Sequence, residues 1–231
     1  MKPHIIPRVI LKQFRVTLDE NSPVLVMDKD TKEFRERGIN NRVFLGPSNY
    51  LGNGEHGTLE NQMASKDESG ITRIIDLVRK GHDMKEFLPE LKVLLGNHSA
   101  RSPHFRTHRK VSEHGTLSSE QFHTTAMDVF PNQYLEFPVC IIGLQSNDNR
   151  FILPDFSITH MVLSPDIVIM RAKKHEDTEF AKIAKEDETY FAMKLNQVSY
   201  DECHSWVVSH SKQLLQSLGG TEKKMAAANR R

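Results

Sequence analysis

The sequence is poor in cysteine and carries almost no net charge. Its two cysteines, Cys140 and Cys203, lie in an apolar run and in a helix-like segment. This placement favours reduced structural thiols over a disulfide scaffold and predicts a reducing compartment. The 31 basic and 30 acidic side chains leave a formal charge of +1. Such a balance provides no long-range field for nucleic acid or a membrane, so electrostatic recognition has to be local.

Long apolar runs are missing as well, and no stretch approaches the length of a membrane span. Pro7, Arg8 and Lys12 interrupt the first apolar segment, which is too short and too charged for a signal peptide. We therefore expect a cytoplasmic protein without membrane contact. With 231 residues, 38% of them hydrophobic, the chain can bury one sizeable core. We predict one domain over residues 1–218 and a disordered basic tail over residues 219–231.

The order of apolar patterns predicts an α+β fold around one core. It has an N-terminal hairpin, central helices, a second small β region and two C-terminal helices. The predicted elements are a short helix with Pro7 in its first turn, a hairpin over 24–37, a short strand at 43–45, helices over 58–78, 84–95 and from Ser118, strands over 138–145, 151–153, 160–163 and 166–171, and helices over 176–195 and 200–218.

His4 is the first candidate for chemistry. The segment from His4 to Pro7 looks like the opening of an HNH nuclease, in which such a histidine acts as general base. The asparagine and second histidine of that site have no well-spaced counterpart here. The alternative is a structural histidine that forms hydrogen bonds at the start of the first helix.

A basic tract over residues 98–110 is the second candidate. It includes Arg101, His104 and Arg106, and an arginine fork suits a phosphate or a carboxylate. A phosphate-bearing ligand is therefore one interpretation, and a solvated charged face at a helix end is the other. Zinc is disfavoured because the histidines lack paired short spacing and no cysteine lies nearby.

Three further polar residues lie at the ends of predicted elements. Asp155 directly follows an apolar strand, where active-site acids often project into a cleft, although turns also favour aspartate. Glu60 falls in the first turn of a predicted helix, where the helix dipole stabilises a carboxylate in any case. Asn196 ends one predicted helix, which is a common structural position for asparagine.

In order along the chain, these residues resemble the bacterial family known as domain of unknown function 4238. The resemblance rests on short motifs, which are His4, Pro7, Leu11 and Phe14, then the Leu59-Glu60 pair, then Arg101, Pro103, Phe105 and Arg106, then Asp155, and then the Leu195-Asn196 pair. The family usually has Ser or Thr before the late aspartate, whereas Pro154 stands here, and the interval from the arginine block to Asp155 is short. The resemblance implies a reduced or divergent member, and it implies no particular reaction.

Two hypotheses about function follow. In the first, the protein is a nuclease-like hydrolase acting on a phosphodiester or nucleic-acid substrate. Its catalytic residues are then His4, Glu60, Asp155 and Asn196, and its substrate-binding residues are Arg101, His104 and Arg106. The carboxylates are compatible with a divalent metal, but no residue is assigned as a ligand. In the second, the protein is a non-catalytic binding or regulatory module, and the same residues form a structural polar network. Nucleic acid or a phosphorylated ligand is the candidate partner.

Overall fold

The computed structural model describes residues 5–45, 69–101, 139–148, 150–157, 159–171 and 177–218. The first helix, α1 (Arg8–Gln13), begins after Pro7, which occupies the N-cap position. Ile10, Leu11 and Phe14 are completely buried. The predicted short helix with one apolar face is therefore confirmed, and it anchors the N-terminal segment on the core.

The predicted hairpin is also confirmed. It consists of β1 (Val24–Asp28) and β2 (Phe34–Arg37), which pair antiparallel. The carboxylate of Asp28 accepts a hydrogen bond from the Thr31 amide at 2.8 Å, and this bond stabilises the hairpin turn. Lys32 adopts a left-handed backbone with φ 58°, so the turn reverses the chain without a glycine.

The strand predicted at residues 43–45 is wrong, because the segment forms a 3-10 turn, η1 (Arg42–Phe44). The side chain of Asn41 accepts a hydrogen bond from the Val43 amide at 3.2 Å. A capping asparagine of this kind favours a turn over an extended chain. The turn directs Phe44 into the core, where its side chain is completely buried.

The central helices described are α3 (Ser69–Arg79) and α4 (Leu88–Arg101), with a 3-10 turn, η3 (Met84–Glu86), between them. Gly81, with φ 73°, ends the first helical run as its sequence predicted. The helix predicted over 84–95 begins later than expected. Pro89 falls in the first turn of α4, where the missing amide hydrogen costs nothing. The predicted start of α3, over 58–68, and the helix from Ser118 lie outside the described residues.

The second β region consists of four strands. They are β3 (Val139–Gly143), β4 (Leu153–Pro154), β5 (His160–Ser164) and β6 (Ile167–Arg171). One sheet has the order β3-β6-β5, and the other has the order β2-β1-β7-β4, in which β7 is Trp206–Ser209. Every pairing between these strands is antiparallel. With helices around two antiparallel sheets, the predicted α+β class is confirmed.

The C-terminal part corrects two predictions, because the single helix predicted over 176–195 is divided at Asp187 and its second half continues to Glu202. It contains α7 (Asp177–Glu186), α8 (Glu188–Glu202) and then β7 (Trp206–Ser209), before residues 212–218 turn helical again. The single helix predicted over 200–218 is therefore wrong. All four residues of β7 are buried, so the strand lacks the alternation that identifies a half-exposed strand.

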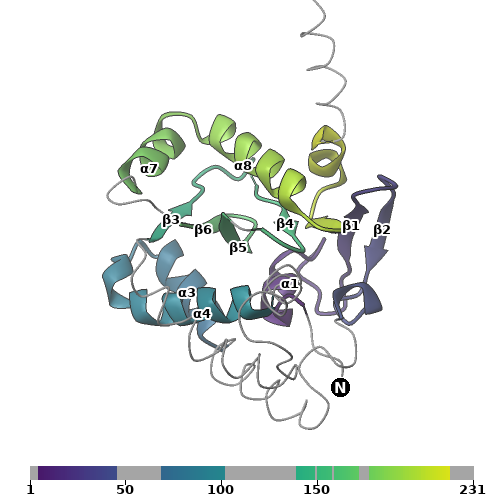
Figure 1. Ribbon diagram of the computed structural model, residues 1–231, viewed down its shortest axis with the longest axis horizontal. Helices are drawn as coiled ribbons and strands as arrows, with labels where there is room; N and C mark the ends of the chain where they lie inside the picture. The colour runs from purple at the N-terminus through teal and green to yellow at the C-terminus, as the bar shows by residue number, and fades with distance from the viewer. Residues whose placement is uncertain are drawn as a thin grey trace, which may run out of the picture.

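The elements form layers, with α7 and α8 on one side of the strands and α3 and α4 on the other (Figure 1). One apolar cluster joins α1, α3, α4, α8 and strands of both sheets. A second cluster lies on the opposite face of β1 and β7, where Leu25, Met27 and Val207 pack with Leu215 and Leu218. Because β1 pairs with β7, the two ends of the chain build one sheet. In the described part of the chain, no helix has the length and apolar character needed to cross a membrane.

Candidate functional site

Only two of the predicted site residues have described side chains, Asp155 and Asn196. Arg101 is the last residue of α4, and its side chain lies outside the described set. The remaining residues, His4, Glu60, His104 and Arg106, also lie outside the described residues. Their assignment stays a prediction.

Asp155 immediately follows β4 and is only 7% exposed. Its two carboxylate oxygens accept hydrogen bonds from the amides of His204 and Ser205, each at 2.7 Å. Its own amide donates to the carbonyl of Trp206 at 3.0 Å. Burial raises the pKa of Asp155, and the amides of Ser205 and His204 oppose this rise. The carboxyl group therefore ties the end of β4 to the turn between α8 and β7.

Asn196 lies within α8 and is 2% exposed, so the prediction that it ends a helix is wrong. Its Oδ1 accepts from the Ile152 amide at 2.9 Å, and its Nδ2 donates to the Arg150 carbonyl at 2.8 Å. The side chain thus offers the main chain the same donor and acceptor that a neighbouring strand would offer. Asp155 and Asn196 together hold both ends of the short strand β4.

A third buried polar group, His160 at the start of β5, was missed by the sequence reasoning. Its Nε2 lies 2.7 Å from the hydroxyl of Ser199, and its Nδ1 lies 2.9 Å from the hydroxyl of Ser157. Ser157 donates to Glu202 at 2.5 Å, so its oxygen is free to accept from Nδ1. Nε2 then accepts from Ser199. Burial lowers the pKa of His160 to about 4, against the opposing charge of Glu202, so the ring is neutral.

A spacing on α8 could have revealed this network. Asn196, Ser199 and Glu202 follow one another at intervals of three, which places them along one face of the helix. Asn196 and Ser199 are polar yet buried. A polar row on a helix face that also carries core residues indicates partners elsewhere in the fold.

The distance between Ser199 and His160 is that of a nucleophile and its general base. However, Ser199 is completely buried and His160 is 5% exposed. A substrate atom cannot approach a hydroxyl in that position in this fold. The arrangement instead satisfies every nitrogen of the ring, which is what a buried polar network needs to stabilise a packed core.

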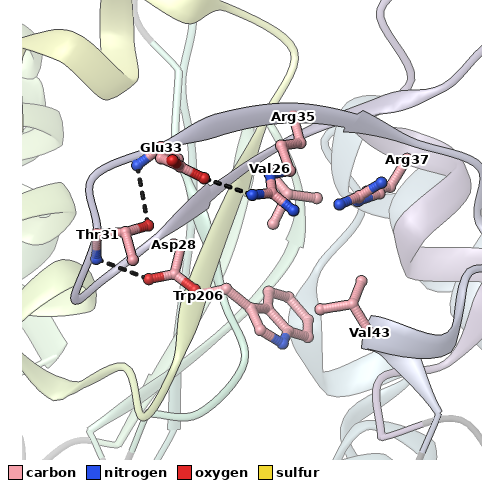
Figure 2. Close-up of a pocket in the computed structure, with 8 residues that line it drawn as sticks. All are labelled: Val26, Asp28, Thr31, Glu33, Arg35, Arg37, Val43 and Trp206. Carbon is pink, nitrogen blue, oxygen red and sulfur yellow. Dashed lines mark hydrogen bonds and ion pairs between the residues drawn. The ribbon is translucent and has the colours of Figure 1, made fainter.

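A hollow lies beside β2, next to Trp206 (below, the β2 hollow; Figure 2). Alternation along the strands explains its lining, because Arg35 and Arg37 lie opposite Val26 and Val24 and share their face of the sheet, which is opposite to the face of Leu25 and Met27. It holds about 230 Å³ of open space. Its lining residues are Val26, Asp28, Thr31, Glu33, Arg35, Arg37, Val43 and Trp206.

Three of the four charged residues of the β2 hollow already have partners. Arg35 and Glu33 form an ion pair at 2.5 Å. Asp28 caps the hairpin turn, and the Thr31 amide is the main cause that lowers the pKa of its carboxyl group. Arg37 is half-buried, and among the described residues its guanidinium makes neither a hydrogen bond nor an ion pair. Within the part of the chain that the structure describes, Arg37 is thus the one charged residue of the β2 hollow without a counter-charge.

Trp206 forms the apolar wall of the β2 hollow. Its indole packs edge-to-face on Phe44, with ring centroids 5.2 Å apart and planes at 81°.

In the described part of the chain, no three His, Cys, Asp or Glu side chains gather as metal ligands would.

The fold and these sites define an α+β protein with two antiparallel sheets, a buried polar network at β4 and an open hollow at β2. The chain belongs to the family described as Protein of unknown function (DUF4238), which it matches over residues 2–136. The resemblance noted from the sequence is thereby confirmed. The match includes the positions of His4, Glu60 and Arg101, whereas Asp155 and Asn196 lie beyond it. Neither a curated protein nor a solved structure matches the chain.

Proposed function

We propose that the protein is a cytoplasmic, non-catalytic binding module, in which Asp155 and Asn196 serve the packing of the fold. One observation carries the proposal. Every side-chain oxygen and nitrogen of these two residues is engaged with main-chain groups. A general base or a ligand-binding amide would need at least one such atom directed at open space.

The bound partner in this proposal is a ligand with an anionic group. The support is the pair of arginines in the β2 hollow, one of which has no counter-charge among the described residues. An arginine fork recognises oxyanions by two parallel hydrogen bonds. Nucleic acid and phosphorylated ligands both carry such groups.

The test is a cleavage assay with purified protein on RNA and single-stranded DNA, with and without magnesium, manganese or zinc. A non-catalytic module leaves every substrate intact at protein concentrations up to those of the substrate. Asp155→Ala and Asn196→Ala should lower the melting temperature, and these variants, like the parent protein, should cleave none of the substrates. Cleavage that Asp155→Ala abolishes without lowering the melting temperature would refute the proposal.

The second candidate is a nuclease-like hydrolase. The observation in its favour is that the family match over residues 2–136 includes the positions of His4, Glu60 and Arg101, which are predicted to act in catalysis and substrate binding. A hydrolase that uses His4 should lose on the order of a hundredfold or more in rate in the His4→Ala variant, at unchanged melting temperature. His160→Gln is the control, because His160 is buried and its substitution should lower stability without a specific loss of rate.

A further inference from the structure

On the face of the sheet that carries Val24 and Val26, β2 has arginine side chains, whereas the neighbouring strand β1 has apolar ones. Across the hairpin, Arg37 lies opposite Val24 and Arg35 lies opposite Val26, and both valines are buried. Charged side chains facing inward at a sheet edge discourage pairing with other strands. That role requires no hollow, and here the two guanidinium groups face a space bounded by Trp206 and Val43 (Figure 2).

We propose that the β2 hollow binds the carboxylate or phosphate end of a small molecule, with Arg37 as the residue that anchors the anionic group. The inference rests on the proposed binding function and gives that function a site. Arg35 is already neutralised by Glu33, so a ligand has to displace an ion pair to use it. Arg37 has no partner among the described residues that a ligand would have to displace.

The rest of the ligand is apolar and compact. The walls next to Arg37 are Val26, Val43 and the indole of Trp206, none of which offers a carboxylate or an ammonium group. The carboxylate of Asp28 lies at the turn end of the β2 hollow, and its lowered pKa keeps it negatively charged. A second anionic group at that end would be repelled, so one terminal anion on an apolar body fits these walls best.

Trp206 makes the binding directly measurable because the chain has a single tryptophan. The probes are phenyl phosphate and benzoate, which differ in the anion and share the ring, with benzyl alcohol as the neutral control. The indole N–H resonance of the full-length protein is followed during titration at low and at moderate salt. We expect a saturable shift with at least one anionic probe and none with benzyl alcohol, and the probe that binds more tightly identifies the anion.

The variant series tests Arg37. Arg37→Gln should raise the dissociation constant about tenfold or more, and Arg37→Lys should have an intermediate effect because it keeps the charge and loses the fork. Arg42→Gln is the matched control, since this exposed arginine on η1 carries the same charge and does not line the β2 hollow. Its dissociation constant should stay within about twofold of the parent value.

Two results would overturn the site, either no saturable shift with both anionic probes or equal weakening by Arg37→Gln and Arg42→Gln. Equal weakening would indicate nonspecific electrostatic attraction instead of binding at a formed site. Phenol released from phenyl phosphate, together with the expected Arg37-dependent shift, would support the site and refute the non-catalytic function. The two proposals therefore fail separately.

Discussion

The side-chain oxygen of Asn196 accepts the Ile152 amide at 2.9 Å, so a helix side chain supplies the hydrogen bond that a neighbouring strand would otherwise supply. β4 has only two residues, and it pairs with β7 through Leu153 and Pro154. A strand this short gains little from its own ladder. Asn196 and Asp155 hold the main chain at its two ends, which makes both side chains part of the fold.

Asn196→Ala is expected to destabilise the protein. It leaves the Ile152 amide and the Arg150 carbonyl without their partner, which costs about 1–3 kcal/mol for each buried group that stays unpaired. Thermal unfolding followed by circular dichroism should show a melting temperature lower by several degrees. Met193→Ala, at an exposed position of the same helix, is the control and should change little. An unchanged melting temperature in Asn196→Ala would argue against the structural role.

Substitutions of Asp155 should form a graded series. Asp155→Ala removes the acceptor for both the His204 and the Ser205 amides, whereas Asp155→Asn keeps one acceptor oxygen. We expect the unfolding free energy to decrease from the parent to the Asn variant and then to the Ala variant, with about 1–3 kcal/mol lost at the last step. Urea titration measures the series, and Asp148→Ala at an exposed site serves as the control. A purely catalytic aspartate would leave all three curves coincident.

The buried, neutral ring of His160 should make the stability of the fold sensitive to acid. Its pKa is about 4 in the folded protein and about 6.5 in the unfolded chain, so the folded state binds its proton less readily. Stability from this group is therefore present above pH 6.5 and is lost as the pH falls toward 4, by an amount on the order of 3 kcal/mol.

The measurement is the unfolding free energy of the parent and of His160→Gln at several values between pH 7.5 and pH 4. The parent curve should fall more steeply than that of the variant within this window and run parallel to it above pH 7. Parallel curves over the whole range would show that His160 titrates normally in the folded state.

Both cysteines should resist alkylation. Cys140 and Cys203 are free and buried, and burial raises the pKa of Cys203 to about 12. Because the thiolate is the reactive form, a buried thiol with this pKa reacts slowly. Iodoacetamide at pH 8 should add to neither residue in the folded protein and to both after denaturation, as read by mass spectrometry. Labelling of Cys203 at the rate of a free thiol would contradict its burial.

The elements predicted well are those whose cause is local. The hairpin follows from an apolar strand and a polar turn next to it, with Asp28 capping the turn. α1 follows from Pro7 and the spacing of Ile10, Leu11 and Phe14. Both depend on residues within a few positions of one another, so sequence periodicity and turn chemistry were sufficient.

The strand β7 could not be predicted in this way. Trp206, Val207 and Val208 form a continuous apolar run, which is equally compatible with a buried helix or a buried strand. The run forms a strand because β1, which lies near the N-terminal end of the sequence, pairs with β7 along its length. Pairing between such distant segments leaves no trace in the local pattern.

The sequence by itself determined that Asp155 follows a strand, because that depends on local order, whereas Asn196, predicted to end a helix, lies within α8. Only the tertiary structure decided what their polar atoms contact, since the amides of His204 and Ser205 and the Ile152 main chain come from elsewhere in the fold. The β2 hollow has the same origin. Arg37 and Trp206 line the same hollow because β7 lies in the same sheet as the hairpin, and burial of the two apolar clusters is what brings those strands together.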